Sequence, residues 1–353
     1  MDSRRFFEQA LTEWMKGEGP DSDIVISSRV RIARNLNGYP FPMLATKSQS
    51  GEVLDKIREL HEAGNLQEDG EVEMVPLSEL SELEKKVLVE KHLISPNLAN
   101  ESQNGAVLLN ESESISIMVN EEDHIRIQVL ASGFQIREAW QVANEVDDRF
   151  EELLEYAFDE RRGFLTSCPT NVGTGIRASV MIHLPALVIT QQINRILQAI
   201  TQVGLAVRGI YGEGSEAVGN LFQISNQITL GQSEEEILDN LHSVVRQIIE
   251  HERSARQILA VESRARMQDR ICRSYGILTH AIIMDSKEAA QRLSDVRLGV
   301  DLGMVQNVSK TALNELLVMT QPAFLQQLSG EKLSAEGRDI RRAELIRSHL
   351  AQK

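Results

Sequence analysis

Apolar residues near the N-terminus recur at the spacing of one face of a helix. Phe6, Phe7, Leu11 and Trp14 follow this spacing, and the segment KGEGP ends it. Because residues three and four apart lie on the same side of a helix, the pattern predicts one short amphipathic helix over residues 1–20. Helical spacing returns further along the chain over 51–63, 81–92, 136–158, 186–203 and 233–260.

Alternation of apolar and polar residues predicts strands between these helices. It begins at Ile24 and Ile26 and is clearest over residues 114–130, where two alternating runs flank the polar turn NEED. A further strand is predicted within ASVMIHLP, residues 178–185, which ends at a proline. Residues 205–227 predict two more strands around a glycine-rich loop.

The pattern changes again near residue 256, after which helical runs dominate and no strand pattern is clear. We therefore expect an α+β fold in three parts: a short N-terminal helix over 1–22, a strand-rich domain over 23–255, and an all-helical C-terminal domain over 256–353. No Pro/Ser-rich linker separates the last two parts, so we expect them to pack closely.

Composition narrows the class of protein. The 353 residues carry a net charge of −15, which argues against nucleic-acid binding through a basic face. Only two cysteines occur, Cys168 and Cys272, without disulfide or zinc spacing. We find no secretory signal and no apolar run long enough for a membrane span, so the expected compartment is a reducing cytoplasm.

Five arginines stand beside glycines or in predicted strands of this acidic chain. Arg29 and Arg31 lie two apart in a strand, so both face one side; the others are Arg126, Arg177 and Arg208. Arginine binds phosphate oxygens through a planar fork, and glycine lets the backbone approach closely. The set favours a polyphosphate site, although each arginine alone is equally consistent with a surface ion pair.

Two acidic loops and one cysteine add candidate chemistry. The turn NEED contains Glu122, and the loop GEGSE contains Glu213 and Glu216. Two such loops could hold a guanidinium from both sides, because carboxylates match it bidentately; turns also favour acidic residues for no functional reason. Cys168 lies near arginines that could lower its pKa, or it is buried and inert.

Four segments together resemble the guanidino-phosphotransferases, the family of creatine and arginine kinases. They are SSRVRIARN, NEEDHIRI, CPTNVGTGIRAS and VRGIYGEGSE with the following FQISN, in family order over about residues 23–250. The resemblance implies an antiparallel-sheet catalytic domain flanked by helices, with ATP and Mg²⁺ as cofactors. Only about twenty residues precede the first segment, and a helical region with RDIRRA follows the last. In both respects the chain resembles the bacterial protein-arginine kinases, which transfer the γ-phosphate of ATP to arginine side chains of proteins.

The resemblance also implies roles for individual residues. Glu122 would orient the guanidinium and accept its proton, Glu216 or Glu213 would oppose it, and Cys168 would lie beside the reacting nitrogen. Tyr211 stands where the arginine-kinase pattern has an arginine, which leaves one phosphate cation fewer. The implied nucleotide contacts are Ser27, Ser28, Arg29, Val30, Arg31, His92, Arg126, Arg177, Ala178, Ser179, Val180, Met181, Arg208, Gly209, Ile210, Tyr211, Gly212 and Glu213.

RDIRRA, near the C-terminus, is implied to bind phosphoarginine through Arg338, Asp339, Arg342 and Ala343. On the residues alone, the same stretch fits a solvated, charge-paired helix face. The implied partners are protein substrates with exposed arginine, a zinc-binding activator protein, a heat-shock repressor and a Clp ATPase with its protease. The apolar C-terminal helices also allow a homodimer.

Two alternatives stay open at this point. The chain could phosphorylate a free guanidino compound, in which case free arginine would be a substrate. It could instead be a catalytically silent phosphoarginine-binding adaptor, in which case it would neither bind nor hydrolyse nucleotide.

Overall fold

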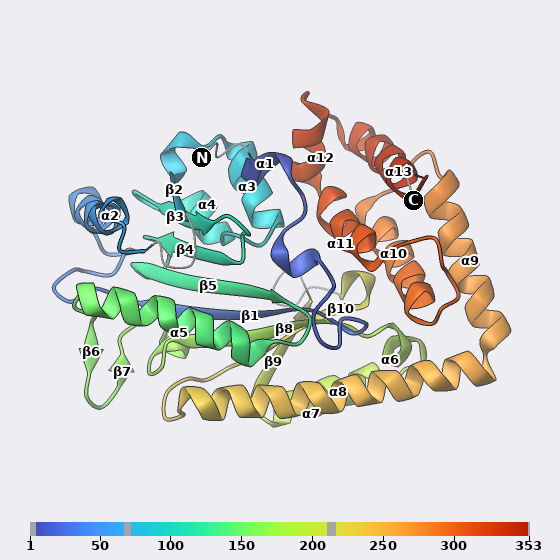
Figure 1. Ribbon diagram of the computed structural model, residues 1–353, viewed down its shortest axis with the longest axis horizontal. Coiled ribbons are helices and arrows are strands. Elements are labelled where there is room, and N and C mark those ends of the chain that lie inside the picture. The colour runs from blue at the N-terminus through green and yellow to red at the C-terminus, as the bar shows by residue number, and fades with distance from the viewer. Residues whose placement is uncertain (1–4, 67–71, 210–216, 352–353) are drawn as a thin grey trace.

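The computed structural model describes residues 5–66, 72–209 and 217–351, and its centre is one antiparallel sheet (Figure 1). The sheet has eight strands in the order β2-β3-β4-β5-β1-β8-β10-β9, and each adjacent pair is antiparallel. Their bounds are β1 Val25–Arg34, β2 Val72–Pro76, β3 Ala106–Asn110, β4 Ile115–Val119, β5 Ile125–Ser132, β8 Ile176–His183, β9 Leu205–Gly209 and β10 Leu221–Asn226. A separate hairpin pairs β6 Phe158–Asp159 with β7 Gly163–Phe164.

One face of the sheet packs against helices and forms the largest apolar core. Its inward residues include Val30, Ile32, Ile127 and Val180, all buried among helices that follow predicted apolar periods. The helices on this side are α2 Lys47–Glu62, α5 Ile136–Leu153, α6 Pro185–Ile189, α7 Ile193–Gln202 and α8 Glu234–Glu262. The predicted helix over 186–203 is interrupted at Gln191, whose φ of +60° is incompatible with a continuous helix.

The opposite face carries a second core built from the N-terminal segment and short helices. This core contains Phe6 and Trp14 together with residues of α3 Glu82–Glu90, α4 Pro96–Glu101 and α12 Pro322–Ser329. The prediction of one amphipathic helix over 1–20 is wrong for the described residues, which form α1 Arg5–Glu8 and a 3₁₀ turn, η1 Glu13–Met15. The backbone at Thr12 between them is extended. Phe6 and Phe7 on one side and Trp14 on the other therefore reach the core separately.

Helices alone form the C-terminal region, as predicted. They are α9 Arg264–His280, α10 Ser286–Asp301, α11 Lys310–Met319, α12 and α13 Ala335–Ala351, and they enclose a third apolar cluster around Leu278, Leu293 and Ile346. The α+β prediction is therefore confirmed. The predicted boundary at 255/256 falls within α8, which continues unbroken to Glu262. None of the helices described is long and apolar enough to cross a bilayer.

Candidate active site

The strand register gathers the predicted arginines on one face of the sheet. Arg31 of β1 pairs with Arg177 of β8 and with Gln128 of β5, and Arg29 pairs with Ser179. Directly paired residues of antiparallel strands point to the same side, and so do residues two apart. The face therefore also carries Arg126, and Arg208 through its pairing with Gln223. We call Arg29, Arg31, Arg126, Arg177 and Arg208 the arginine face.

The guanidinium groups make this face electropositive, and burial and mutual repulsion weaken their hold on their protons. Burial, and then the charges of Arg177 and Arg126, lower the pKa of Arg29 to about 10. Burial and the neighbouring arginines lower the pKa of Arg31 well below its usual value, against the opposing pull of Glu121. The Nε of Arg31 has no hydrogen-bond partner among the described residues. Buried like charges held together in this way favour an anion between them.

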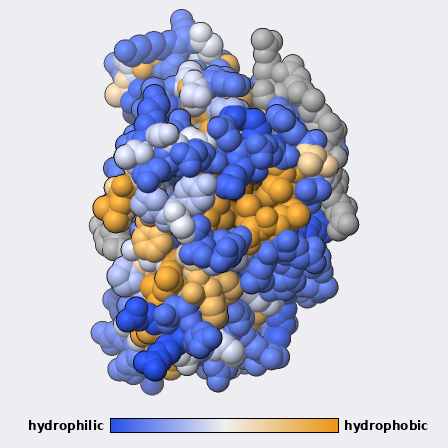
Figure 2. Space-filling model, turned by 90° about the vertical axis from the view of Figure 1, so that its left-hand side faces the viewer, coloured by the Kyte–Doolittle hydropathy of each residue, from blue (hydrophilic) through white to orange (hydrophobic). Residues whose placement is uncertain are grey.

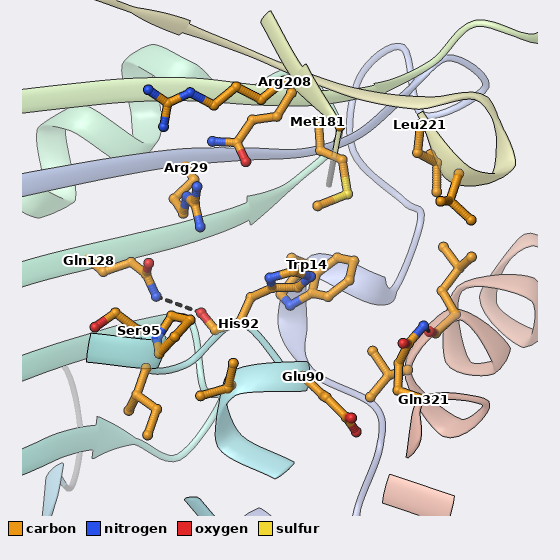
Figure 3. A pocket seen from close by; sticks show the side chains of 18 of the residues that line it. Trp14, Arg29, Glu90, His92, Ser95, Gln128, Met181, Arg208, Leu221 and Gln321 are labelled. Carbon is orange, nitrogen blue, oxygen red and sulfur yellow. Dashed lines mark hydrogen bonds between the residues drawn. The ribbon is translucent and has the colours of Figure 1, made fainter. Parts of the chain in front are cut away.

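A cavity of about 410 Å³ lies against the arginine face (Figure 3). Arg29, Arg31 and Arg208 line it on the sheet side, and Trp14 and His92 lie between the sheet and the helices. Burial, and then the charge of Arg29, lowers the pKa of His92 to about 4, so His92 is neutral at pH 7. Its carbonyl oxygen accepts a hydrogen bond from Gln128 Nε2 at 2.8 Å, which fixes the turn after α3.

The C-terminal helices supply the wall opposite the sheet. Leu293 of α10, Leu317 of α11, and Thr320 and Gln321 after α11 all line the cavity. Glu90, at the end of α3, lines it as well, and its two carboxylate oxygens accept hydrogen bonds from the backbone N–H groups of Ala323 and Phe324, both at 2.8 Å. The helical side of the cavity is thus mainly apolar, with Glu90, Thr320 and Gln321 as polar exceptions, and the sheet side is cationic. This is a typical lining for a ligand with a base and phosphates.

The NEED turn lies at one end of the arginine face. Arg126 pairs with Glu121 at 2.7 Å and with Glu122 at 2.8 Å, and its Nη2 is 3.7 Å from Asp123. Burial acts to lower the pKa of Arg126, but these three carboxylates outweigh it and raise the pKa. Glu122 is the most exposed of the three, with 36% of its side chain accessible, whereas Asp123 is fully buried. The carboxylate predicted to accept a proton is therefore accessible to solvent and held by Arg126.

The Cys168 turn is tied directly to the NEED turn. Ser167 Oγ donates to the carbonyl oxygen of Glu122 at 2.7 Å, and its backbone N–H donates to Asp123 at 2.7 Å. Cys168 is partly exposed, and its Sγ lies 3.0 Å from Thr170 Oγ1. The structure thus places Cys168 and Glu122 in one connected unit, next to the arginine face but outside the lining of the cavity.

Several predicted nucleotide contacts point away from this face. The side chains of Val30, Ala178 and Val180 lie in the helix-covered core. Ser28 Oγ donates to the carbonyl oxygen of Gly133 and accepts from the backbone N–H of Gln135, so its hydroxyl holds the turn before α5. Alternation along β1 and β8 explains this, because every second residue of a predicted run must face the core.

The remaining predicted contacts divide between the cavity and undescribed residues. Ser27, Ser179 and Met181 share the side of the arginine face, and Gly209 lines the cavity. The predicted residues Ile210, Tyr211, Gly212, Glu213 and Glu216 lie outside the described residues.

The predicted phosphoarginine motif lies on α13. Arg342 is buried and donates to the carbonyl oxygens of Thr320 and Met284 at 2.8 and 2.9 Å, and to Asp339 at 2.5 Å. Ala343 is buried in the C-terminal cluster. Of the four residues predicted to bind phosphoarginine, Arg338 and Asp339 are partly exposed and are the ones that a ligand could reach.

Sequence reasoning missed residues of the cavity that come from distant segments. Trp14, Gln128, Gln223 and Gln321 line it from η1, β5, β10 and the end of α11. Gln128 and Gln223 follow the same two-residue alternation as the arginines, so that alternation could have identified them. Trp14 and Gln321 carried no such signal.

Comparison with known proteins gives two family matches. Residues 52–255 match the model of the ATP:guanido phosphotransferase C-terminal catalytic domain, and residues 264–353 match the model of the protein-arginine kinase McsB C-terminal domain. The protein-arginine kinase of Brevibacillus brevis is 64% identical over 99% of this chain and 98% of its own length. That of Halalkalibacterium halodurans is 59% identical with the same coverage.

Solved structures give the same fold. A crystal structure of lombricine kinase superposes with a TM-score of 0.58 and 25% identity, over 70% of this chain and 69% of that chain. The duplicated taurocyamine kinase from Schistosoma mansoni, with bound transition-state analogue components, superposes with the same TM-score and 28% identity, over 70% of this chain and 35% of that chain. The predicted guanidino kinase-like fold is thus confirmed.

Proposed function

This chain belongs to the protein-arginine kinases of the ATP:guanido phosphotransferase family, and on that premise we propose how its own residues perform the transfer. The arginine face holds the phosphates of ATP, and the apolar wall of the cavity takes the base. Glu122 and Cys168 lie where the arginine of a protein substrate meets the γ-phosphate. The observation that carries this proposal is the connection through Arg126, which belongs to the arginine face and contacts Glu122 at 2.8 Å.

The transfer needs positioning and charge neutralisation more than covalent help. A guanidinium nitrogen forms a bond to the γ-phosphorus, the bond from that phosphorus to the bridging oxygen breaks, and ADP leaves. The guanidinium loses one proton in the process, and Glu122 accepts it. Arg29 and Arg31 neutralise the phosphate oxygens as charge moves toward ADP. Cys168 lies beside the reacting guanidinium nitrogen.

The implied Mg²⁺ would be carried by the nucleotide and held by its phosphate oxygens. In the part of the chain that the structure describes, no three acidic, histidine or cysteine residues are placed to hold a metal ion. Mg²⁺ is usually held by phosphate oxygens, water and one or two carboxylates, so the cationic cavity fits a metal that the phosphates carry. When bound, the ion supplies further neutralisation of phosphate charge. The second carboxylate, Glu216 or Glu213, lies outside the described residues and stays part of the proposal.

The decisive experiment compares Glu122→Gln with wild type and with the exposed control Glu160→Gln. Phosphoarginine formed from Mg-ATP is measured by phosphorus NMR and mass spectrometry, and nucleotide binding by calorimetry. Loss of a general base lowers rates by about 10²–10⁴-fold, so we expect kcat of Glu122→Gln to fall at least 100-fold with nucleotide affinity nearly unchanged. A kcat within threefold of wild type would exclude Glu122 as the proton acceptor.

The same assay separates the cavity's role from that of Glu122. Arg31→Gln should weaken nucleotide binding, because it removes a buried cation from the phosphate side of the cavity. Unchanged nucleotide affinity in this variant would place the phosphates elsewhere. Phosphorylation of free arginine, tested beside a protein substrate, would identify activity on small guanidino compounds.

Membership of the family also supports proposals about the cellular role. The phosphoarginine mark directs proteins to a Clp ATPase and its protease, and a heat-shock repressor is among the substrates. A zinc-binding protein activates the kinase, and all of this occurs in the cytoplasm. Arg338 and Asp339 of α13 bind phosphoarginine, the arginine through the phosphate and the aspartate through the guanidinium. Phosphoarginine peptide binding to Asp339→Asn, compared with wild type, tests the last point.

A further inference from the structure

Large apolar side chains are exposed around the Glu122–Cys168 unit. Met43 and Leu44 are 73% and 74% accessible, and Phe158, Ile228 and Leu230 are 57%, 58% and 52% accessible. Figure 2 views the molecule from the end that carries β6 and β7 in Figure 1, and apolar side chains gather there within a mostly hydrophilic surface. We call these five residues the apolar rim.

Ile228 and Leu230 are fixed directly against the Cys168 turn. Thr229 between them is buried, and its Oγ1 donates to the carbonyl oxygens of Thr170 and Val172 at 3.0 and 2.6 Å. Both exposed side chains therefore lie on the surface next to the turn that contains Cys168.

The hairpin that carries Phe158 is tied to the same turn. The ring of Phe158 contacts that of Phe164 edge to face, with centroids 5.2 Å apart. The backbone N–H of Phe164 donates to the carbonyl oxygen of Gly173 at 2.8 Å, and a Cβ at Gly173 would lie 3.0 Å from the Cα of Leu230. Phe158 and Phe164 thus contact each other, and Gly173 links this hairpin to the segment of Leu230, close to the Cys168 turn.

Met43 and Leu44 stand on the side of the NEED turn. Their loop is held by His124, two residues after Glu122. The backbone N–H of Leu36 donates to His124 Nδ1 at 3.0 Å, so the proton is on Nε2, which donates to the carbonyl oxygen of Pro40 at 3.0 Å. Tyr39 packs edge to face on the same imidazole. The loop is therefore anchored at the reacting end.

We propose that the apolar rim is a docking surface for the polypeptide segment that carries the target arginine, and that it selects segments with large apolar side chains two to four residues from that arginine. An extended chain advances about 3.3 Å per residue, so such side chains lie roughly 7–13 Å from the arginine on either side. This inference rests on the proposed function, because the arginine must reach Glu122 and Cys168 while its neighbours lie on the rim.

The substrate segment fits this surface better than a second copy of the chain does. The rim borders Glu122 and Cys168 from both sides, so a stable interface between copies there would cover the reacting groups. A substrate must instead cross this surface at each turnover. Exposed apolar residues gathered at one place usually mark an interaction site.

The test compares two peptides of equal length with one arginine each. One has leucine and phenylalanine at the second and fourth positions on both sides, and the other has serine at those positions. Side chains that bind equally in the ground and transition states lower KM without changing kcat. For wild type we expect a KM at least tenfold lower for the apolar peptide, with kcat within twofold.

The variants locate this preference on the rim. Phe158→Ser combined with Leu230→Ser should bring the two KM values within about twofold, and Met43→Ser combined with Leu44→Ser should reduce their ratio as well. Activity on the serine peptide and nucleotide affinity should not change. Val261→Ser is the matched control, because Val261 is 81% accessible near the C-terminal end of α8, at the opposite end of the molecule in Figure 1.

The outcomes separate this inference from the proposed function. Phosphorylation of both peptides with equal KM would overturn the proposed role of the apolar rim and leave the proposed function intact. Failure of wild type to phosphorylate either peptide would be a failure of the proposed function. If the rim variants kept the preference but dissociated a dimer in sedimentation experiments, the surface would be an interface between copies and the inference would be wrong.

Discussion

At the scale of single residues, the carboxylate of Asp123 joins three segments of the proposed site. Its Oδ1 accepts hydrogen bonds from Asn35 Nδ2 after β1 and from the backbone N–H of Ser167, both at 2.7 Å. Ser167 Oγ in turn reaches the carbonyl oxygen of Glu122 at 2.7 Å. The separation of Glu122 from Cys168 is therefore set by side chains that lie outside the lining of the cavity.

Ser167→Ala should lower kcat about tenfold. The variant removes the bond to the Glu122 carbonyl, and small misplacements of reacting groups slow reactions strongly. KM for nucleotide should stay constant, because the arginine face is untouched, and Ser167→Thr should restore most of the rate. Steady-state kinetics of both variants, with Thr201→Ala on α7 as the control, measures this. Equal kcat for the alanine variant and wild type would show that the link does not position Glu122.

At the scale of elements, one buried lysine at the end of α3 binds both the N-terminal segment and the turn between β3 and β4. Lys91 is fully buried, and its Nζ lies 2.7 Å from Glu113 and 2.9 Å from the carbonyl oxygen of Phe6. Burial lowers the pKa of Lys91 and raises that of Glu113, each against the attraction of the partner. Trp14 Nε1 also donates to the carbonyl oxygen of Lys91, so the cavity wall depends on this contact.

Lys91→Met should lower the free energy of unfolding by roughly 3 kcal/mol, because it leaves Glu113 buried without its partner. The double variant Lys91→Met with Glu113→Gln removes both charges and should recover most of the loss. Urea unfolding of the two variants and wild type checks this. If the double variant were no more stable than the single one, the unpaired charge would not be the cause.

The strands that pattern predicted best are those whose apolar and polar residues alternate in the sequence. The run from Ile115 to Val119 and the run from Ile125 to Val129 alternate, and both are strands as expected. We missed β3, whose five residues are all buried, because a short uninterrupted apolar run has no period. The same limit applies to the site. Alternation placed Arg29 and Arg31 together, but no local pattern could bring Trp14 or Gln321 to them from the two ends of the chain.

At the scale of the whole molecule, Glu90 links the sheet domain to the C-terminal helices. It caps α12 from α3, and Arg342 of α13 holds the adjacent carbonyl oxygen of Thr320. Burial raises the pKa of Glu90 to about 6, against the two backbone donors and the charges of Arg342 and Lys86. The packing of the sheet domain against the C-terminal helices therefore depends on the protonation of this carboxyl group, and so on pH.

Glu90 should make the protein less stable as pH rises through about 6. A raised pKa means that the folded state binds the proton more tightly, so its stabilising contribution is complete below about pH 4.5 and is lost above pH 6. The free energy of unfolding of wild type should fall by roughly 2 kcal/mol over this range. Glu90→Gln should not show this fall. Urea unfolding between pH 4.5 and 7.5 measures the difference, with exposed Glu82→Gln as control. Parallel stability curves for wild type and Glu90→Gln would contradict it.

The contrast between the arginine face and the net charge of the chain affects how each substrate arrives. The chain carries −15 overall, whereas Arg29, Arg31 and Arg208 line the cavity. A nucleotide polyanion is repelled at long range and attracted only within about 8 Å at physiological ionic strength, the Debye length. A segment that carries arginine is positively charged there, so the net negative charge of the chain attracts it at longer range. Added salt should therefore speed association with the nucleotide and slow association with the arginine-bearing segment.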